Sequence, residues 1–282
     1  MISIYDILII TALFHFSIQE ETYKDKWRSY PACQIGRLQS PIEIKEYESI
    51  YANNFTFVYQ SYKESQTEDK TDNSYALMLK TITDGGYINF ERGGVIKQYQ
   101  LIRAELYPAL HKIDGDDFKY ELHLIHEKKL DFITNKNQYR SIQDANMYLV
   151  IVLRYSECKN KEKCISDNGL LNTLKESNND KNLFGLNKFN VFQDKRAYFY
   201  EGSFLHIPCD ENVNYYVVKD YFYLNGFNPS ISLSLEEKDI VPANKFGRPV
   251  YKNFMNYREV LGDNYFSFTK IVISFLLMLL LL

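Results

Sequence analysis

The sequence has little net charge, few glycines and no internal repeat. Its 33 basic and 36 acidic side chains leave a net charge of −3, which is too small to suggest a nucleic-acid partner. Only 12 glycines stand against 24 tyrosines and 19 phenylalanines, a composition that favours a β-rich fold. With 45% hydrophobic residues, the 282-residue chain suits one large domain or two small ones with an ample core.

Basic residues are nowhere dense enough to predict a glycan-binding patch. The nearest candidate is the lysine-rich stretch 158–164, CKNKEKC, for which a solvated loop is the simpler interpretation. The polar stretches 61–74 and 158–185 are predicted to be surface insertions.

Residues 1–19 are predicted to be a secretory signal peptide. The apolar stretch from Ile7 to Phe16 has the length of a signal core, although no Lys or Arg precedes it and Asp6 is present. A buried strand is the alternative interpretation. If the signal is used, the domain that follows, residues 20–262, faces the outside of the cell or the lumen of a secretory organelle.

Residues 263–282 are predicted to attach the protein to a membrane. The run from Ile271 to Leu282 has 12 apolar residues and no charge, which is short for a transmembrane helix of about 20 residues. The small residues Gly262, Asp263 and Asn264 lie upstream, so the pattern favours a glycolipid-anchor signal whose tail is removed. A tail anchor or membrane-dipping helix is the alternative.

Two stretches within residues 99–126 show strand alternation. The first places Ile102, Ala104 and Leu106 in an apolar row, and Arg103, Glu105 and Tyr107 in a polar row on the other face. The second places Glu121, His123 and Ile125 on one face, and Leu122, Leu124 and His126 on the other. Two neighbouring strands that direct polar side chains at one cavity are how a metal site is built.

Further short motifs surround this segment in a fixed order. They are Gln39-Ser40-Pro41-Ile42, Gly93-Gly94 with Tyr99, the stretch 144–154, the stretch 200–213, and Asn256 with Arg258. In number, order and spacing, they and the two strands resemble the α-carbonic anhydrase family over roughly residues 23–260. The resemblance implies a mostly β fold with short helices (α+β), built on a large, twisted, mainly antiparallel central sheet.

The resemblance also implies that two of the three zinc-binding histidines are replaced. Their positions carry Glu105 and Tyr107, while His123 matches the third ligand and Glu121 the carboxylate that orients it. A different register would put Ala104 and Leu106 at the ligand positions. We prefer the first register because it keeps the apolar row toward the core.

Other parts of the family's site are replaced as well. Leu205 stands where the family has a threonine that binds the metal-bound hydroxide, and Leu110 where a glutamate holds that threonine. The segment 83–86 lacks the proton-shuttle histidine, and Arg103 replaces a glutamine beside the metal. We expect Arg103 to pair with Glu105 where zinc would be, because a lone buried glutamate is costly.

Histidine is too scarce to rebuild the site. Of five histidines, His15 leaves with the signal peptide, His111 resembles a buried structural histidine of the family, and His126 points to the core. Only His206 is placed to join His123, so a zinc site of His123, His206 and Glu105 is the remaining alternative. We therefore expect no cofactor, with zinc as the alternative.

The four cysteines agree with export. The resemblance implies a disulfide between Cys33 and Cys209, which leaves Cys158 to pair with Cys164 in a short loop. A thiolate zinc site is the other use of four cysteines, but the spacing of Cys158 and Cys164 suits it poorly. Asn54 begins an acceptable glycosylation sequon.

The sequence thus predicts a catalytically inactive carbonic anhydrase-like domain, displayed on a cell-surface or secretory-pathway membrane and acting as a binding or adhesion module. Its ligand would be an unknown protein or glycan. One competing hypothesis is an enzyme with residual zinc-dependent CO2 hydration. Another is a purely structural surface-coat protein.

Overall fold

A computed structural model of the chain describes about half of its residues. The described residues are 30, 33, 36–69, 77–81, 84–115, 118–129, 146–157, 164–165, 183–185, 196–205, 209–224, 241–242 and 248–254. The predicted signal peptide and the predicted anchor region both lie outside them. Among the described residues, no helix is long and apolar enough to cross a membrane.

The described part of the chain consists mostly of strands, which confirms the predicted fold class. Helix is represented by one short 3-10 turn, η1 (Glu46–Glu48). The strands are β1 (Ile42–Ile44), β2 (Ile50–Tyr51), β3 (Phe55–Tyr62), β4 (Glu64–Asp69), β5 (Leu77–Thr81), β6 (Gly86–Arg92), β7 (Val95–Pro108), β8 (Lys112–Ile113), β9 (Tyr120–Lys128), β10 (Tyr148–Ser156), β11 (Cys164–Ile165), β12 (Leu183–Gly185), β13 (Ala197–Gly202), β14 (Val213–Tyr223), β15 (Val241–Pro242) and β16 (Tyr251–Lys252).

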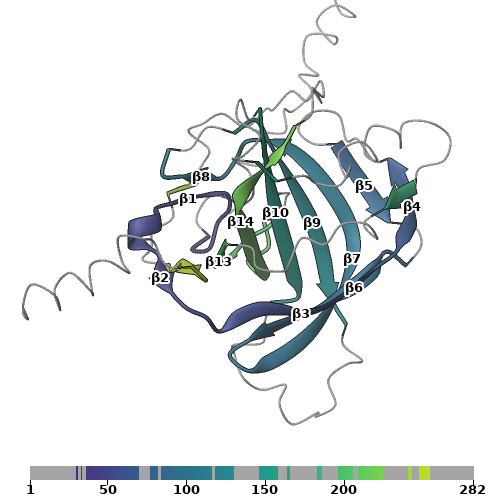
Figure 1. Cartoon of the computed structure of the whole chain (residues 1–282), viewed down its shortest axis with the longest axis horizontal. Helices are drawn as coiled ribbons and strands as arrows, with labels where there is room; N and C mark the ends of the chain where they lie inside the picture. The colour runs from purple at the N-terminus through teal and green to yellow at the C-terminus, as the bar shows by residue number, and fades with distance from the viewer. Residues whose placement is uncertain are drawn as a thin grey trace, which may run out of the picture.

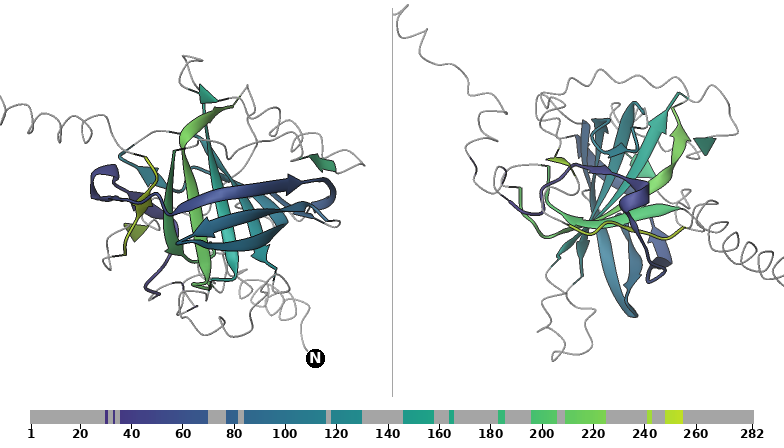
Figure 2. Two further views of the ribbon diagram at one scale, coloured as in Figure 1. Left: turned by 60° about the horizontal axis from the view of Figure 1, so that its bottom comes forward. Right: turned by 90° about the vertical axis from the view of Figure 1, so that its left-hand side faces the viewer.

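One large curled sheet contains most of these strands (Figures 1 and 2). Its order is β12-β4-β5-β7-β9-β10-β14-β13-β16-β2, with β6 paired to the first half of β7 and β3 paired to β6. Its described pairings are antiparallel except β10–β14, β11–β14 and β16–β2. A small parallel sheet, β15-β1-β8, lies beside it.

Strand β10 lies at the centre of the large sheet and is buried on both faces. Its sequence YLVIVLRYS is rich in β-branched and aromatic residues, and its seven inner residues are all buried. A strand covered on both faces needs such a continuous apolar run rather than an alternation. Strand β10 therefore separates two cores, which pack on opposite faces of the sheet.

The two cores take alternate residues from each central strand. The first core contains Ala104, Leu106, Leu122, Leu124, Leu149 and Ile151, with Phe57, Phe90 and Phe199 among its aromatic members. The second core contains Ile125, Val150, Val152, Tyr215, Val217 and Phe254. We call the face of the sheet that carries the second core the site face, because Glu105 and His123 lie on it.

Ile102 does not lie where the alternation placed it. It packs against the second core, while Ala104 and Leu106 belong to the first core. The cause is a shift of register between Leu101 and Arg103, where β7 has one residue more than β9. Such a β-bulge puts two consecutive residues on the same side of the strand. The predicted apolar row was therefore wrong at Ile102 and correct at the other two positions.

His126 lies in the first core, as predicted. Its Nδ1–H donates to the carbonyl of Leu149, and the Tyr62 hydroxyl donates to Nε2 at 2.7 Å. Burial lowers the pKa of His126 from 6.5 to about 4, because a charged imidazole there would lose its hydration. His126 is therefore neutral at physiological pH, and its two ring nitrogens join β3, β9 and β10.

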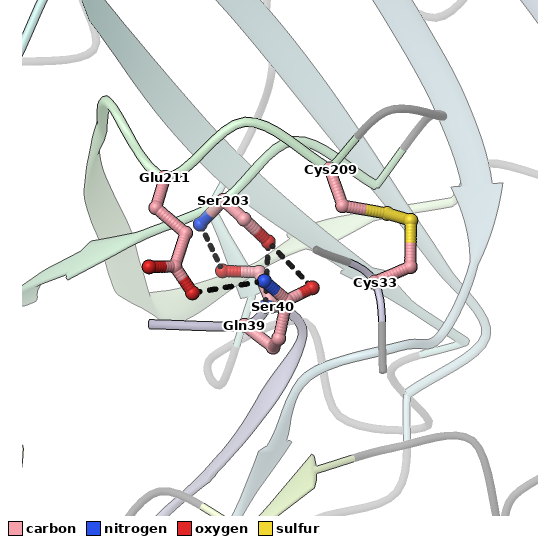
Figure 3. Close-up of a disulfide and its surroundings, with 6 residues drawn as sticks. All are labelled: Cys33, Gln39, Ser40, Ser203, Cys209 and Glu211. Atoms are coloured by element: carbon pink, nitrogen blue, oxygen red, sulfur yellow. Dashed lines mark hydrogen bonds between the residues drawn. A yellow bond between two sulfur atoms is a disulfide. The ribbon is translucent and has the colours of Figure 1, made fainter. Parts of the chain in front are cut away.

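The disulfide implied by the family resemblance is present. Cys33 and Cys209 are bonded and join chain positions 176 residues apart (Figure 3). The bridge ties the N-terminal segment to the loop that follows β13. Of the other proposed pair, Cys158 lies outside the described residues and only the backbone of Cys164 is described, so that bridge stays a prediction.

Removal of the disulfide is expected to destabilise the domain. Cys33→Ser should lower the free energy of unfolding by roughly 2–5 kcal/mol, because the unfolded chain regains the entropy of a long open loop. Cys209→Ser and the double variant should lose the same amount, since all three open one bridge. Urea denaturation measures the effect. Peptide mapping that joins Cys33 to Cys158 or Cys164 would contradict this pairing.

Acid is expected to weaken the fold through His126. The unfolded state takes up a proton near pH 6.5, whereas the folded state does so only near pH 4. The contribution of His126 to the free energy of unfolding is therefore complete above pH 6.5. It is lost as the pH falls toward 4, by about 3 kcal/mol in all. Urea titrations at pH 7, 5.5 and 4 measure the slope of the free energy of unfolding against pH. In His126→Phe the slope should be shallower than in wild type, and an unchanged slope would show that His126 does not contribute.

Candidate functional site

The site is built on the site face of β7 and β9, where the two strands pair side by side. Glu105 lies opposite His123, and Tyr107 lies opposite Glu121. This pairing places Glu105 and Tyr107 on the same face as His123, and their correspondence to two histidine ligands of the family stays a prediction. The rings of Tyr107 and His123 are 4.8 Å apart between centroids.

The Glu105 carboxylate is buried and has two strong hydrogen-bond donors. The Arg103 guanidinium donates through Nε to Oε1 at 2.7 Å, and the Tyr107 hydroxyl donates to Oε2 at 2.6 Å. The Glu105 side chain is only 2% exposed, whereas that of Arg103 is 25% exposed. The expected Arg103–Glu105 pair therefore forms, and Tyr107 satisfies the second oxygen.

Regular alternation from Arg103 onward places Arg103 and Glu105 on the same face of β7, two residues apart. The bulge lies before Arg103 and changes the side on which Ile102 lies. Two consecutive residues, Ile102 and Arg103, therefore share the site face beside the second core.

Phe204 lies against the exposed side of this ion pair. The Arg103 guanidinium carbon is 5.2 Å from the centre of the Phe204 ring, a cation–π contact. Phe204 packs edge-on against Tyr148 at 4.7 Å, and its neighbour Leu205 is buried. The loop after β13 therefore places the aromatic ring of Phe204 next to Arg103.

His123 keeps the orientation that a metal ligand of this type requires. Its Nε2 is hydrogen-bonded to Glu121 Oε1 at 2.8 Å, which leaves Nδ1 for the opposite side. Within the described part of the chain, Nδ1 has no hydrogen-bond partner. In metal sites, a carboxylate often accepts a hydrogen bond from the ring nitrogen of a histidine ligand that does not bind the metal, and Glu121 holds His123 in the same way.

Glu121 also holds His111, so that a hydrogen-bonded network continues into the core. Glu121 accepts from His111 Nδ1 at 3.0 Å and from the His111 backbone N–H at 3.2 Å. Although burial alone would raise the pKa of Glu121, the two neighbouring histidines lower it well below its usual range. Glu121 is therefore a carboxylate in the folded protein.

The far side of His111 connects the network to the disulfide-linked loop. Tyr200 and His111 Nε2 are hydrogen-bonded at 2.6 Å, and the Tyr200 hydroxyl lies 3.3 Å from Ser40 Oγ. Ser40 and Ser203 bond reciprocally, each backbone N–H donating to the other's hydroxyl oxygen (Figure 3). Gly202 is needed here, because a Cβ would lie 2.2 Å from Ser40 Oγ.

Glutamine and glutamate side chains complete this junction. Glu211 Oε1 accepts from the Leu38 backbone N–H at 2.7 Å and from Gln39 Nε2 at 3.0 Å. Figure 3 shows these residues beside the Cys33–Cys209 bridge. The segment before β1 and the segment after β13 are thus joined by a covalent bond and by a set of buried hydrogen bonds.

The described residues do not fit a catalytic zinc ion. His111, Glu121 and His123 each have a ligand atom within 4.8 Å of the others, and the Glu121 carboxylate is hydrogen-bonded to both imidazoles. A cation there would compete with these hydrogen bonds. On the other side, Glu105 is bound to Arg103 and Tyr107, and a neutral phenol is a poor ligand.

The other predicted site residues are placed as follows. Leu110 and Leu205 are both buried. Because their side chains are aliphatic, neither can form a hydrogen bond to a small polar ligand. His206 and residues 262–264 lie outside the described residues, so their predicted roles stay predictions. Asn54 is exposed, as its sequon requires, and glycosylation there stays a prediction.

Comparisons with known proteins agree with this geometry. A family model described as eukaryotic-type carbonic anhydrase matches residues 22–232. Alpha carbonic anhydrase 8 of Arabidopsis thaliana is 27% identical over 202 residues, which cover 69% of this chain and 47% of that protein. Carbonic anhydrase 6 of Homo sapiens is 26% identical over 215 residues, which cover 70% of this chain and 66% of that protein.

A solved structure shows the same fold. The crystal structure of dioscorin complexed with ascorbate matches with a TM-score of 0.57 and 18% identity, over 84% of this chain and 94% of that chain. A large curled sheet with a histidine oriented by a buried glutamate defines a carbonic anhydrase-like domain. The chain belongs to the eukaryotic-type carbonic anhydrase family.

Breaking the Arg103–Glu105 pair is expected to destabilise the domain. Arg103→Met should cost roughly 2–4 kcal/mol, because Glu105 then stays buried with less compensation. The double variant Arg103→Met/Glu105→Leu should recover most of that loss. Lys45→Met is the control, since its ion pair with Glu48 is solvent-accessible and screened by water, so that its loss should cost much less. Equal losses in Arg103→Met and Lys45→Met, measured in urea, would contradict a structural role for the pair.

Proposed function

We propose that this protein is a carbonic anhydrase family member without catalytic activity that acts as a binding module on the outer or lumenal side of a membrane. One observation carries the proposal: the Glu105 carboxylate is bound to Arg103 and Tyr107 beside His123. Three residues thus satisfy one another at the place where the family resemblance would put a metal ion. Both carboxylate oxygens of Glu105 are thus already hydrogen-bonded, which disfavours the entry of a cation.

The chemistry of the family supports this proposal. Hydration of CO2 needs a metal-bound hydroxide near neutral pH, and three neutral imidazoles leave zinc the charge that ionises its bound water. A glutamate ligand would reduce that charge, and the positive Arg103 would repel the ion. In addition, the buried Leu110 and Leu205 cannot orient a hydroxide.

Several features support display outside the cytoplasm. The Cys33–Cys209 disulfide is of a kind that persists in oxidising compartments. The predicted signal peptide and the predicted membrane attachment at residues 263–282 agree with the same location. As the ligand of this module we propose a protein or a glycan. The reason is that the domain keeps its large sheet and the disulfide-linked loop after β13 without a catalytic metal site.

Retained activity is the second candidate. His123 keeps both its orientation by Glu121 and an Nδ1 without a partner among the described residues, which favours some residual metal affinity. His206 would be the first residue to test as a second ligand. Such an enzyme would hydrate CO2 with a non-standard metal site.

Metal content separates the two candidates. We expect wild-type protein purified with zinc to hold less than one equivalent of metal and to show no CO2 hydration above background. Elemental analysis and stopped-flow pH-indicator assays measure the two quantities. One tightly bound zinc per chain together with CO2 hydration would overturn the proposal, and loss of that zinc in His206→Ala would then identify the replacement ligand.

Restoring the site should proceed in two stages. Glu105→His/Tyr107→His with Arg103→Gln should bind zinc, because three imidazoles complete a tetrahedral site with zinc–nitrogen distances of about 2.0–2.1 Å. Activity should appear only when Leu205→Thr and Leu110→Glu are added, since orienting the hydroxide is a separate requirement. The matched control adds His123→Ala to the first set and should lose the zinc again.

A further inference from the structure

A small exposed apolar surface lies at one edge of the large sheet. It consists of Tyr47 in η1 and Ile50 and Tyr51 in β2, which are 75%, 51% and 44% exposed. We call it the edge patch. Three large apolar side chains at such exposure within five consecutive residues are a candidate interaction surface.

The end of the described chain lies directly beside the edge patch. Strand β16 pairs in parallel with β2, so that Tyr251 lies opposite Ile50 and Lys252 opposite Tyr51 (Figure 1). Phe254 then packs into the second core, 5.3 Å from the ring of Tyr198. The described chain therefore ends at a firmly held position next to the edge patch.

The chain beyond Phe254 leads within a short distance to the predicted membrane attachment. Asn264 follows Phe254 by ten residues. A fully extended chain of that length reaches at most roughly 35 Å. If residues 262–264 are attached to lipid, the edge of the sheet that carries β2 and β16 lies within that reach of the membrane.

The chemistry of the edge patch suits a zwitterionic lipid surface. Tyrosine is favoured at membrane interfaces, where its ring meets the acyl boundary and its hydroxyl meets water. The charges that flank Tyr47 cancel, because Lys45 and Glu48 form an ion pair at 3.8 Å. The surface therefore has apolar side chains for partial insertion and no net charge that requires an anionic lipid.

We propose that the edge patch contacts the outer surface of the membrane that carries the C-terminal attachment. This inference rests on the membrane display proposed above and adds which face of the domain meets the lipid. Tyr47, Ile50 and Tyr51 insert among phosphatidylcholine headgroups, and the short tether keeps them there.

Photolabelling by lipid tests the contact. Mature protein from cell membranes is reconstituted in phosphatidylcholine vesicles that contain a diazirine-bearing phosphatidylcholine, floated on a density gradient, irradiated and mapped by mass spectrometry. We expect residues 45–52 to be labelled well above residues 55–62, which contain the similarly exposed Val58 and Tyr59 on β3. Figure 1 shows β3 running away from β2 and η1.

Matched variants sharpen the result. Tyr47→Ser/Ile50→Ser/Tyr51→Ser should lose the labelling of residues 45–52, while Val58→Ser/Tyr59→Ser should leave it unchanged. All five side chains are exposed, so both variants should keep the wild-type circular dichroism spectrum. The wild-type labelling pattern needs no variant and therefore stands even if one of them misfolds.

The outcomes distinguish this inference from the proposed display. Protein that floats with the vesicles but is labelled equally at residues 45–52 and 55–62, or only beyond Phe254, overturns the contact and leaves the display intact. Floating protein whose residues 45–52 cross-link to a second copy instead of lipid also overturns it. Protein that does not float overturns both proposals.

Discussion

A buried carboxylate on a central strand is the constraint on which this structure depends. Glu105 lies on a central strand where it cannot reach water, so its charge has to be compensated from within the protein. Arg103 and Tyr107 provide that compensation from the same strand. Phe204 then packs on Arg103, and the loop that carries Phe204 is held by Ser203, Cys209 and their partners.

The part of the site that survives is the part that also stabilises the fold. Glu121 binds His111 and His123 together, and His111 continues through Tyr200 to Ser40. All of these groups are buried, and each satisfies another, so the loss of any one would leave an unsatisfied polar atom in the core.

Much of this arrangement could be predicted from the sequence, because strands alternate faces and the two central strands have clear patterns. Glu105 and His123 were expected side by side, and the register confirms it. Ile102 could not be placed, since the bulge there is marked by no glycine or proline and depends on how β7 pairs with β9. The contact of Phe204 with Arg103 was also missed, because it joins segments far apart in the sequence.

The neutral pair at Glu105 has an electrostatic consequence for whatever meets this face of the sheet. A metal dication would be the largest local charge and would attract small anions from solution. Arg103 and Glu105 together bring no such field, and the phenyl ring of Phe204 covers the more exposed of the two. The ion pair therefore adds little net electrostatic field to this face of the sheet.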